Sequence, residues 1–212
     1  GNNVDTEWGG IITGSGGLIK QGNGKMNLSG TNFYTGPTTV SNGALIVSGA
    51  TTTTPVTVYT LGTLMGAGYV GAVTNAGGLD PGNATGAVAT LNMRSLNLKQ
   101  GGSMIVDMTA VDGTAGSGWD WVSVSGPITI DTNATYTIYP KGNPADFNPN
   151  ANYTWKIMSG TSINGFNSDL FTVDWSGFVP DLEDGEFVVS QDGNDIVLTF
   201  SASGELPIWD GE

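Results

Sequence analysis

Cysteine and histidine are both missing from this chain of 212 residues. Without cysteine the chain forms no disulfide and no thiolate metal site. Without histidine it also lacks one of the commonest groups for proton transfer in catalysis. Long apolar stretches are missing too, because no run approaches the ~20 residues that a membrane-spanning helix needs. We therefore expect no membrane insertion.

Positive charge is scarce. Six lysines and arginines stand against 19 aspartates and glutamates, which gives a net charge of −13. Binding to a phosphate backbone needs clustered cations, and an anionic membrane surface repels an acidic chain. We therefore expect no nucleic-acid partner.

Helical patterns are weak throughout the sequence. No stretch carries apolar residues at i, i+3, i+4 and i+7 between a cap and a stop. The 34 glycines count against helices as well, since each one inside a helix costs about 1 kcal/mol. The sequence instead contains short alternating segments between glycine and asparagine. We therefore predict an all-β fold.

Residues 17–49 show this strand pattern most clearly. Apolar residues alternate over 25–29 and 38–40, Asn42-Gly43 marks a turn, and a nearly continuous apolar run follows over 44–47. Period-two alternation bounded by glycine and asparagine is typical of short strands and turns. We expect the rest of the chain to be organised around this segment.

The order of residues in this segment is also specific. The positions concerned are Gly16, Gly17, Leu18, Lys20, Gly22, Gly24, Leu28, Ser29, Gly30, Asn32, Tyr34, Thr35, Gly36, Thr38, Thr39, Val40, Gly43, Leu45 and Val47. At this spacing they resemble the passenger-associated repeat of bacterial autotransporters. The resemblance continues through most of the chain, over roughly residues 14–201. Asp80 is a small departure, because alanine is common at that position in the family.

The resemblance implies a fold and a class of protein. In that family the repeat forms rungs of a right-handed parallel β-helix on a secreted, usually non-enzymatic passenger. The implied fold is physically reasonable, since a short strand buries its apolar face only when neighbouring coils cover it. Only one full repeat is present, so we do not expect a long multi-repeat shaft from this chain alone.

We expect a single β-helical domain over residues 1–212 with four parts. These are an N-terminal arm (1–13), the β-helix rungs (14–130), a C-terminal β section (131–202) and a C-terminal tail (203–212). The C-terminal section contains longer, more aromatic strand patterns at 135–139, 154–158, 170–174, 186–190 and 195–200. Such strands favour a partly antiparallel section that caps the end of the β-helix.

The acidic residues offer few signs of catalysis. Asp107, Asp112 and Asp120 lie close in the sequence, and a glycosidase needs two acids about 5 to 9.5 Å apart. Most acids, however, stand beside glycine or in turns, where they are solvated.

The segment 66–71 matches GxGxxG, but more strand rather than a helix follows, so a turn between coils is favoured over a cofactor loop. We expect no catalytic residue and no bound cofactor.

Two surface features suggest binding. The acidic segment 181–186 could hold structural Ca²⁺ through oxygen ligands, although it lacks the spacing of a calcium-loop motif and a solvated loop is favoured. Trp119 and Trp121 flank Asp120. If Asp120 and Val122 share one face, the two tryptophans project from the other and form a platform for a sugar ring. The alternative is that they cover a neighbouring loop.

Apolar residues near both ends are candidates for subunit contact. They are Trp8 in the arm and Leu206, Ile208 and Trp209 in the tail. A simply disordered end would usually be polar. The tail residues either dock on their own domain or insert into the next subunit as an added strand. Contacts of this kind that do not close give filaments.

The sequence thus predicts a non-enzymatic, extracellular structural or adhesive β-helix protein. Its expected partners are other copies of itself or a host or matrix surface, and head-to-tail self-assembly would give a surface fibre. The alternative is a carbohydrate-directed protein, either a glycan binder that uses Trp119 and Trp121 or a β-helical polysaccharide enzyme. Convergent acids in a groove would favour the enzyme, and exposed coplanar tryptophans would favour the binder.

Overall fold

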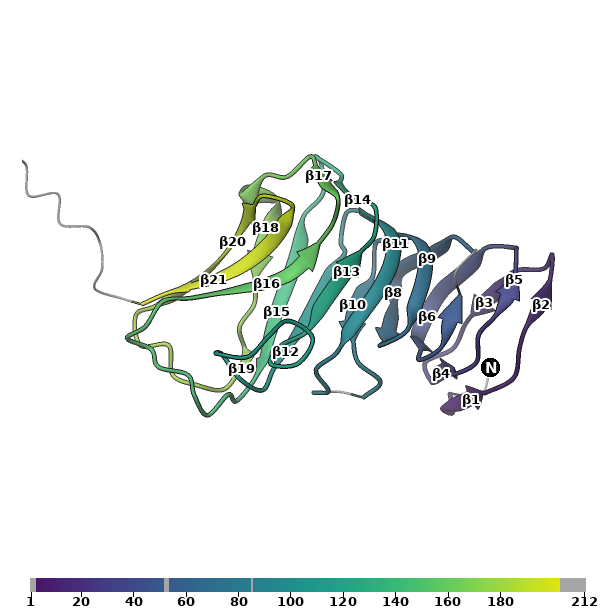
Figure 1. Cartoon of the computed structure of the whole chain (residues 1–212), viewed down its shortest axis with the longest axis horizontal. Coiled ribbons are helices and arrows are strands. Elements are labelled where there is room, and N and C mark those ends of the chain that lie inside the picture. Colours follow the sequence, from purple (N-terminus) through teal and green to yellow (C-terminus); the bar gives the residue numbers. More distant parts are fainter. Residues whose placement is uncertain (1–2, 52–53, 85, 203–212) are drawn as a thin grey trace, which may run out of the picture.

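The computed structural model describes residues 3–51, 54–84 and 86–202. This part of the chain consists of β-strands and loops with one short 3₁₀ helix, η1 (Ser168–Leu170). Strands stack along the long axis of the molecule, from the N-terminal end to the C-terminal end (Figure 1). The predicted all-β fold is confirmed. The described residues contain no helix with the length and apolar character needed to cross a membrane.

The chain winds repeatedly past three faces, and on each face successive strands pair in parallel. Face 1 consists of β3 (Leu18–Lys20), the first parts of β6 (Thr38–Val47) and β8 (Val56–Gly66), the second parts of β9 (Tyr69–Asn75) and β11 (Thr90–Leu98), β14 (Pro127–Ile130) and β17 (Ser162–Asn164). Face 2 consists of β1 (Thr6–Trp8), β4 (Lys25–Leu28), the second parts of β6 and β8, β10 (Gly78–Pro81), β12 (Ser103–Met108), β15 (Tyr136–Gly142), β18 (Phe171–Val173) and β19 (Gly177–Phe178). Face 3 consists of the pair β2 (Thr13–Gly14) and β5 (Phe33–Tyr34), then β7 (Ala50–Thr51), the first parts of β9 and β11, β13 (Trp121–Val124) and β16 (Tyr153–Ser159).

The register shows how many residues each winding takes. On face 1, Leu18, Thr38, Val56 and Val73 stack in register, so successive windings take 20, 18 and 17 residues (18 to 38, 38 to 56, 56 to 73). The next partner of Val73 is Leu96 and that of Leu96 is Ile128, so later windings contain longer excursions. These excursions leave the regular stack after β10 and after β12.

The core lies between the three faces. Inward positions stack in columns, and the column on face 2 contains Leu45, Leu64, Leu79, Met104 and Ile138, all fully buried. One continuous cluster of buried apolar residues extends from Leu28 to Phe200. The predicted turn at Asn42-Gly43 is a corner within one continuous strand, β6, where Gly43 has a positive φ of 68°.

The corner between faces 2 and 3 brings the backbones of successive windings very close. A Cβ placed on Gly30, Gly49 or Gly68 would lie 2.5, 2.3 or 2.0 Å from the carbonyl oxygen of the glycine one winding earlier. Those preceding glycines are Gly10, Gly30 and Gly49. Glycine is therefore required at this corner because a side chain would push the windings apart.

The parallel pattern changes near the C-terminus. β16 pairs antiparallel with β21 (Asp195–Ser201), which pairs antiparallel with β20 (Glu186–Asp192). This change was predicted, and the strand patterns at 135–139, 154–158, 170–174, 186–190 and 195–200 correspond to β15, β16, β18, β20 and β21. Aromatic side chains pack together beneath these strands, with Phe187 contacting the rings of Trp155, Phe178 and Phe200.

Candidate functional site

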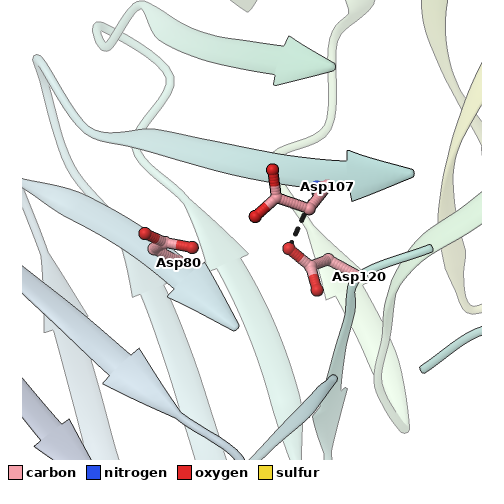
Figure 2. Close-up of side chains that lie close together, drawn as sticks. All are labelled: Asp80, Asp107 and Asp120. Atoms are coloured by element: carbon pink, nitrogen blue, oxygen red, sulfur yellow. Dashed lines mark hydrogen bonds between the residues drawn. The ribbon is translucent and has the colours of Figure 1, made fainter. Parts of the chain in front are cut away.

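Three aspartates from distant parts of the sequence come together outside face 2. Asp80 lies in β10, Asp107 lies in β12, and Asp120 immediately precedes β13. One carboxylate oxygen from each lies within 4.8 Å of the other two. Figure 2 shows the three side chains turned toward one another. Their exposed fractions are 6%, 4% and 0%, so the cluster is closed to large molecules.

The parallel register explains why Asp80 lies outside the main core. Asp80 pairs with Met65 of β8, and Met65 pairs with Ile46 of β6. Ile46 and Met65 belong to a small separate apolar cluster. The chain that follows β10 lies against the acid cluster, because the N–H groups of Gly86 and Ala89 donate to Asp107 and Asp120. Asp80 is therefore on the outward row of the sheet yet buried.

Backbone amides hold two of the carboxylates in place. Gly86 N–H donates to Asp107 Oδ2 at 2.9 Å, and Ala89 N–H donates to Asp120 Oδ1 at 2.8 Å. The N–H of Asp107 donates to Asp120 Oδ2 at 3.0 Å, the bond drawn in Figure 2. Asp80 differs, because its buried Oδ1 accepts no hydrogen bond within the described residues.

In the described part of the chain, no ion pair neutralises the cluster. The two salt bridges among the described residues are Lys99–Asp131 and Lys156–Asp195. Burial, with a smaller contribution from the charge of Asp107, raises the pKa of Asp80 to about 6, and the positive charges of Lys141 and Lys25 oppose that rise. Burial raises the pKa of Asp107 as well, against the Gly86 hydrogen bond and Lys141.

Asp120 is the most strongly affected of the three. Burial raises its pKa to about 8, although the amides of Ala89 and Asp107 favour the charged form. The charges of Asp107 and Asp80 raise it further. Gathering three carboxylates in a buried place therefore stabilises the protonated form unless another positive charge is present.

The raised pKa values of the three aspartates predict how the free energy of unfolding depends on pH when no metal ion is bound. A chelator in the buffer ensures that condition. An unfolded aspartate has a pKa of about 3.9, so between about pH 4 and 8 the folded protein binds more protons than the unfolded one. Stability contributed by these groups is present below pH 4 and is lost as the pH rises toward 8. At about 1.4 kcal/mol per pKa unit, we expect a loss on the order of a few kcal/mol. Urea unfolding at pH 5 and pH 8.5 measures it, and a flat or rising profile would contradict the prediction.

Only some of the acids that the sequence suggested as candidates come together in the structure. Asp107 and Asp120 meet, but Asp112 is exposed in the excursion after β12. The acidic segment 181–186 forms an exposed turn in which Asp181 Oδ1 accepts from the N–H of Glu183 at 2.9 Å. Within the described residues, the group of acids placed to share a metal ion is the Asp80 cluster and not this loop. Calcium at 181–186 stays a prediction.

The exposed pair of tryptophans does not form. Trp119 is only 7% exposed, because it lies against Met108 at the return of the excursion and its indole N–H donates to the carbonyl of Lys156 at 2.8 Å. Trp121 is half-buried, and its indole N–H donates to Ser159 Oγ at 3.0 Å. The assumed alternation is wrong at Trp119 because β13 begins only at Trp121. Glycan contact through Trp121 stays a prediction.

The segment 66–71 joins β8 to β9 and is followed by strand, as expected for a turn between coils.

Of the candidate subunit contacts, Trp8 is 51% exposed on β1 at the N-terminal end. Leu206, Ile208 and Trp209 lie outside the described residues.

The comparisons with known proteins agree with the repeat in the sequence. Residues 18–47 match the family described as Passenger-associated-transport-repeat. The chain is also similar to an extracellular serine protease of Serratia marcescens, with 39% identity over 87 residues. That match covers 40% of this chain and 8% of the length of the protease. Residues 18–47 therefore carry an autotransporter passenger repeat, which confirms the repeat predicted for this segment.

Proposed function

We propose that this chain is a non-enzymatic structural segment of an extracellular passenger, folded as a right-handed parallel β-helix. The passenger repeat over residues 18–47 and the similarity to a protein named as extracellular support the location. Parallel pairing of strands on three faces supports the helix. Crossovers between parallel strands are nearly always right-handed, which supports its hand.

An unpaired edge at the first described winding is the observation that supports the structural role. Within the described residues, β1 pairs with β4, β2 with β5 and β3 with β6, so each of the three has one unpaired edge. Large apolar side chains are exposed at the same end, with Val4, Trp8 and Ile19 at 64%, 51% and 62%. Unpaired edges of this kind readily pair with further strands.

The opposite end offers matching edges. In the described part of the chain, β17 pairs with β14, β18 and β19 pair with β15, and β20 pairs with β21. Among residues 3–202, each face therefore has an unpaired strand edge at the C-terminal end as well. Because the N-terminal edge of one copy differs from the C-terminal edge of the next, their contact is heterologous and leads to a filament. The partner in this proposal is accordingly a second copy, bound head to tail.

The clustered acids support a role without catalysis. Glycoside hydrolysis needs two carboxyl groups that flank the bond to be cleaved. Asp80, Asp107 and Asp120 are too buried to receive a sugar chain. Trp119 is buried too, so the carbohydrate-binding alternative loses one of the two rings on which it was based.

Head-to-tail assembly predicts that charge at the first winding blocks association. We expect the wild-type mass to rise above 21.8 kDa with concentration, as measured by sedimentation velocity and light scattering. Trp8→Lys combined with Ile19→Lys should raise the concentration needed for association by about tenfold or more, equivalent to about 1.4 kcal/mol. Both residues are exposed at the edge, so the substitutions leave the fold intact.

The matched control changes two apolar residues in the middle of the molecule. Tyr59 and Leu61 are 54% and 71% exposed on β8, and Tyr59→Lys with Leu61→Lys should assemble like the wild type. A wild-type mass of 21.8 kDa at every concentration would refute self-assembly. A mass that stops at the dimer would refute the head-to-tail arrangement.

A further inference from the structure

We propose that Asp80, Asp107 and Asp120 together bind one divalent cation that prefers oxygen ligands, and that this cation is Ca²⁺. The site is distinct from the acidic loop at 181–186 and does not depend on the proposed structural role. Its ligands come from β10, from β12 and from the residue that precedes β13, so one ion would join segments that are far apart in the sequence.

The first argument is the state of Asp80. Its side chain is 94% buried, since its exposed fraction is 6%, and its Oδ1 has no hydrogen-bond partner within the described residues. A buried carboxylate oxygen without a partner costs free energy that a hydrogen bond or a cation would offset. In Figure 2 one carboxylate oxygen of Asp80 points to the side where Asp107 and Asp120 lie, the place where a shared ion would lie.

The second argument concerns protons. A cluster of acids can also be neutralised by protonation, but both oxygens of Asp120 already accept backbone N–H groups, from Ala89 and Asp107. A proton would weaken these bonds, because hydrogen bonds to an ionised carboxylate are about twice as strong as those to a neutral acid. A metal ion binds the ionised form, and each oxygen has lone-pair sites for both the hydrogen bond and the ion.

The third argument is the spacing of the oxygens. Calcium binds six to eight oxygen ligands at 2.3–2.6 Å, so two oxygens on the same ion are at most about 5.2 Å apart. One oxygen from each aspartate falls within 4.8 Å of the others. Packing does not require an acid at position 80, because the residue that pairs with Asp80 in the neighbouring strand is the apolar Met65.

The ion would act as a clamp on the outside of face 2. Gly86 N–H and Ala89 N–H donate to two of its carboxylate ligands, so fixing the carboxylates also fixes the chain that follows β10. The cation would hold the excursions after β10 and β12 against the regular stack of windings.

The test uses the full chain, freed of metal with a chelator and titrated with CaCl₂ by calorimetry. We expect one calcium per chain and a melting temperature about 5–10 °C higher at saturating calcium than in chelator. Asp80→Asn should weaken calcium binding at least tenfold and remove most of the shift. This variant is expected to fold, because Oδ1 of Asp80 loses no hydrogen bond. In chelator it should melt at or above the wild-type temperature, since a buried charge is gone.

Asp112→Asn is the matched control, because it removes the same charge from an exposed acid between the two ligands Asp107 and Asp120. Its calcium affinity and melting shift should equal those of the wild type. The proposal is overturned if wild-type melts in calcium and in chelator coincide and calorimetry detects no binding. It is also overturned if Asp112→Asn weakens binding as much as Asp80→Asn does. The wild-type titration alone is decisive if a variant fails to fold.

Discussion

Replacing Gly49 by alanine should destabilise this protein strongly although it adds a single methyl group. The backbone of Gly49 has no positive φ, so alanine is conformationally allowed and the effect would come from the close approach alone. Its Cβ would lie 2.3 Å from the carbonyl oxygen of Gly30, and backbone atoms there cannot rotate away. We expect a loss of about 3 kcal/mol, because overpacking costs about 1–3 kcal/mol and this contact is with backbone on a stacked winding.

Gly16→Ala is the matched control in the same region. A Cβ on Gly16 would meet no heavy atom within 4 Å, and its φ is also not positive. Its stability should change by no more than about 0.5 kcal/mol. Urea unfolding of the two variants compares them directly. Equal stabilities would contradict the close stacking of Gly10, Gly30, Gly49 and Gly68.

Trp155→Ala should have the largest effect of any single substitution in the C-terminal section. Trp155 is fully buried in β16, its indole N–H donates to the carbonyl of Val111 at 3.1 Å, and its ring stacks on Tyr153 at 5.4 Å. Truncating a buried tryptophan to alanine costs about 3–5 kcal/mol. Trp155→Phe keeps a ring but leaves the carbonyl of Val111 without its donor, so it should cost about 1–3 kcal/mol.

Trp175→Ala serves as the control, because the same side chain is 44% exposed there. We expect it to unfold close to the wild-type denaturant concentration.

The shape of the Trp155→Ala transition also tests the predicted single domain. Trp155 packs in the core cluster that extends back to Leu28, so one cooperative transition is expected. Two separated transitions would show that the C-terminal section unfolds alone.

Local patterns in the sequence were enough to predict the strands. The alternation at 25–29 and 38–40 corresponds to β4 and β6, and the aromatic segments near the C-terminus correspond to β15, β16, β18, β20 and β21. These predictions succeeded because each depends on neighbours within a few residues. The glycine-rich repeat likewise marked corners whose conformation is set locally, such as Gly43 in β6.

The acid cluster could not be predicted in the same way. Asp107 and Asp120 are close in the sequence, whereas Asp80 stands out there only as a departure from a family pattern. Their meeting depends on which residues of successive windings share a register, and that depends on the lengths of the excursions after β10 and β12. A sequence does not determine those registers locally. The signal that was available is the acid itself, at a position next to apolar residues Leu79 and Pro81.

Trp119 shows the same limit on a smaller scale. The alternation of Trp119, Asp120 and Trp121 assumes that all three lie in one strand, whereas β13 begins at Trp121. The chain before it returns against β12 and buries both Trp119 and Asp120. Where a strand begins therefore decided which side chains reach the surface.

Electron microscopy of the purified full chain at near-neutral pH tests the proposed role most directly. Head-to-tail stacking of open windings predicts long unbranched fibres with a regular axial repeat, and these should disappear with Trp8→Lys and Ile19→Lys. Uniform particles of 21.8 kDa, with the mass confirmed by light scattering on the same sample, would contradict self-assembly as the function of the open edge.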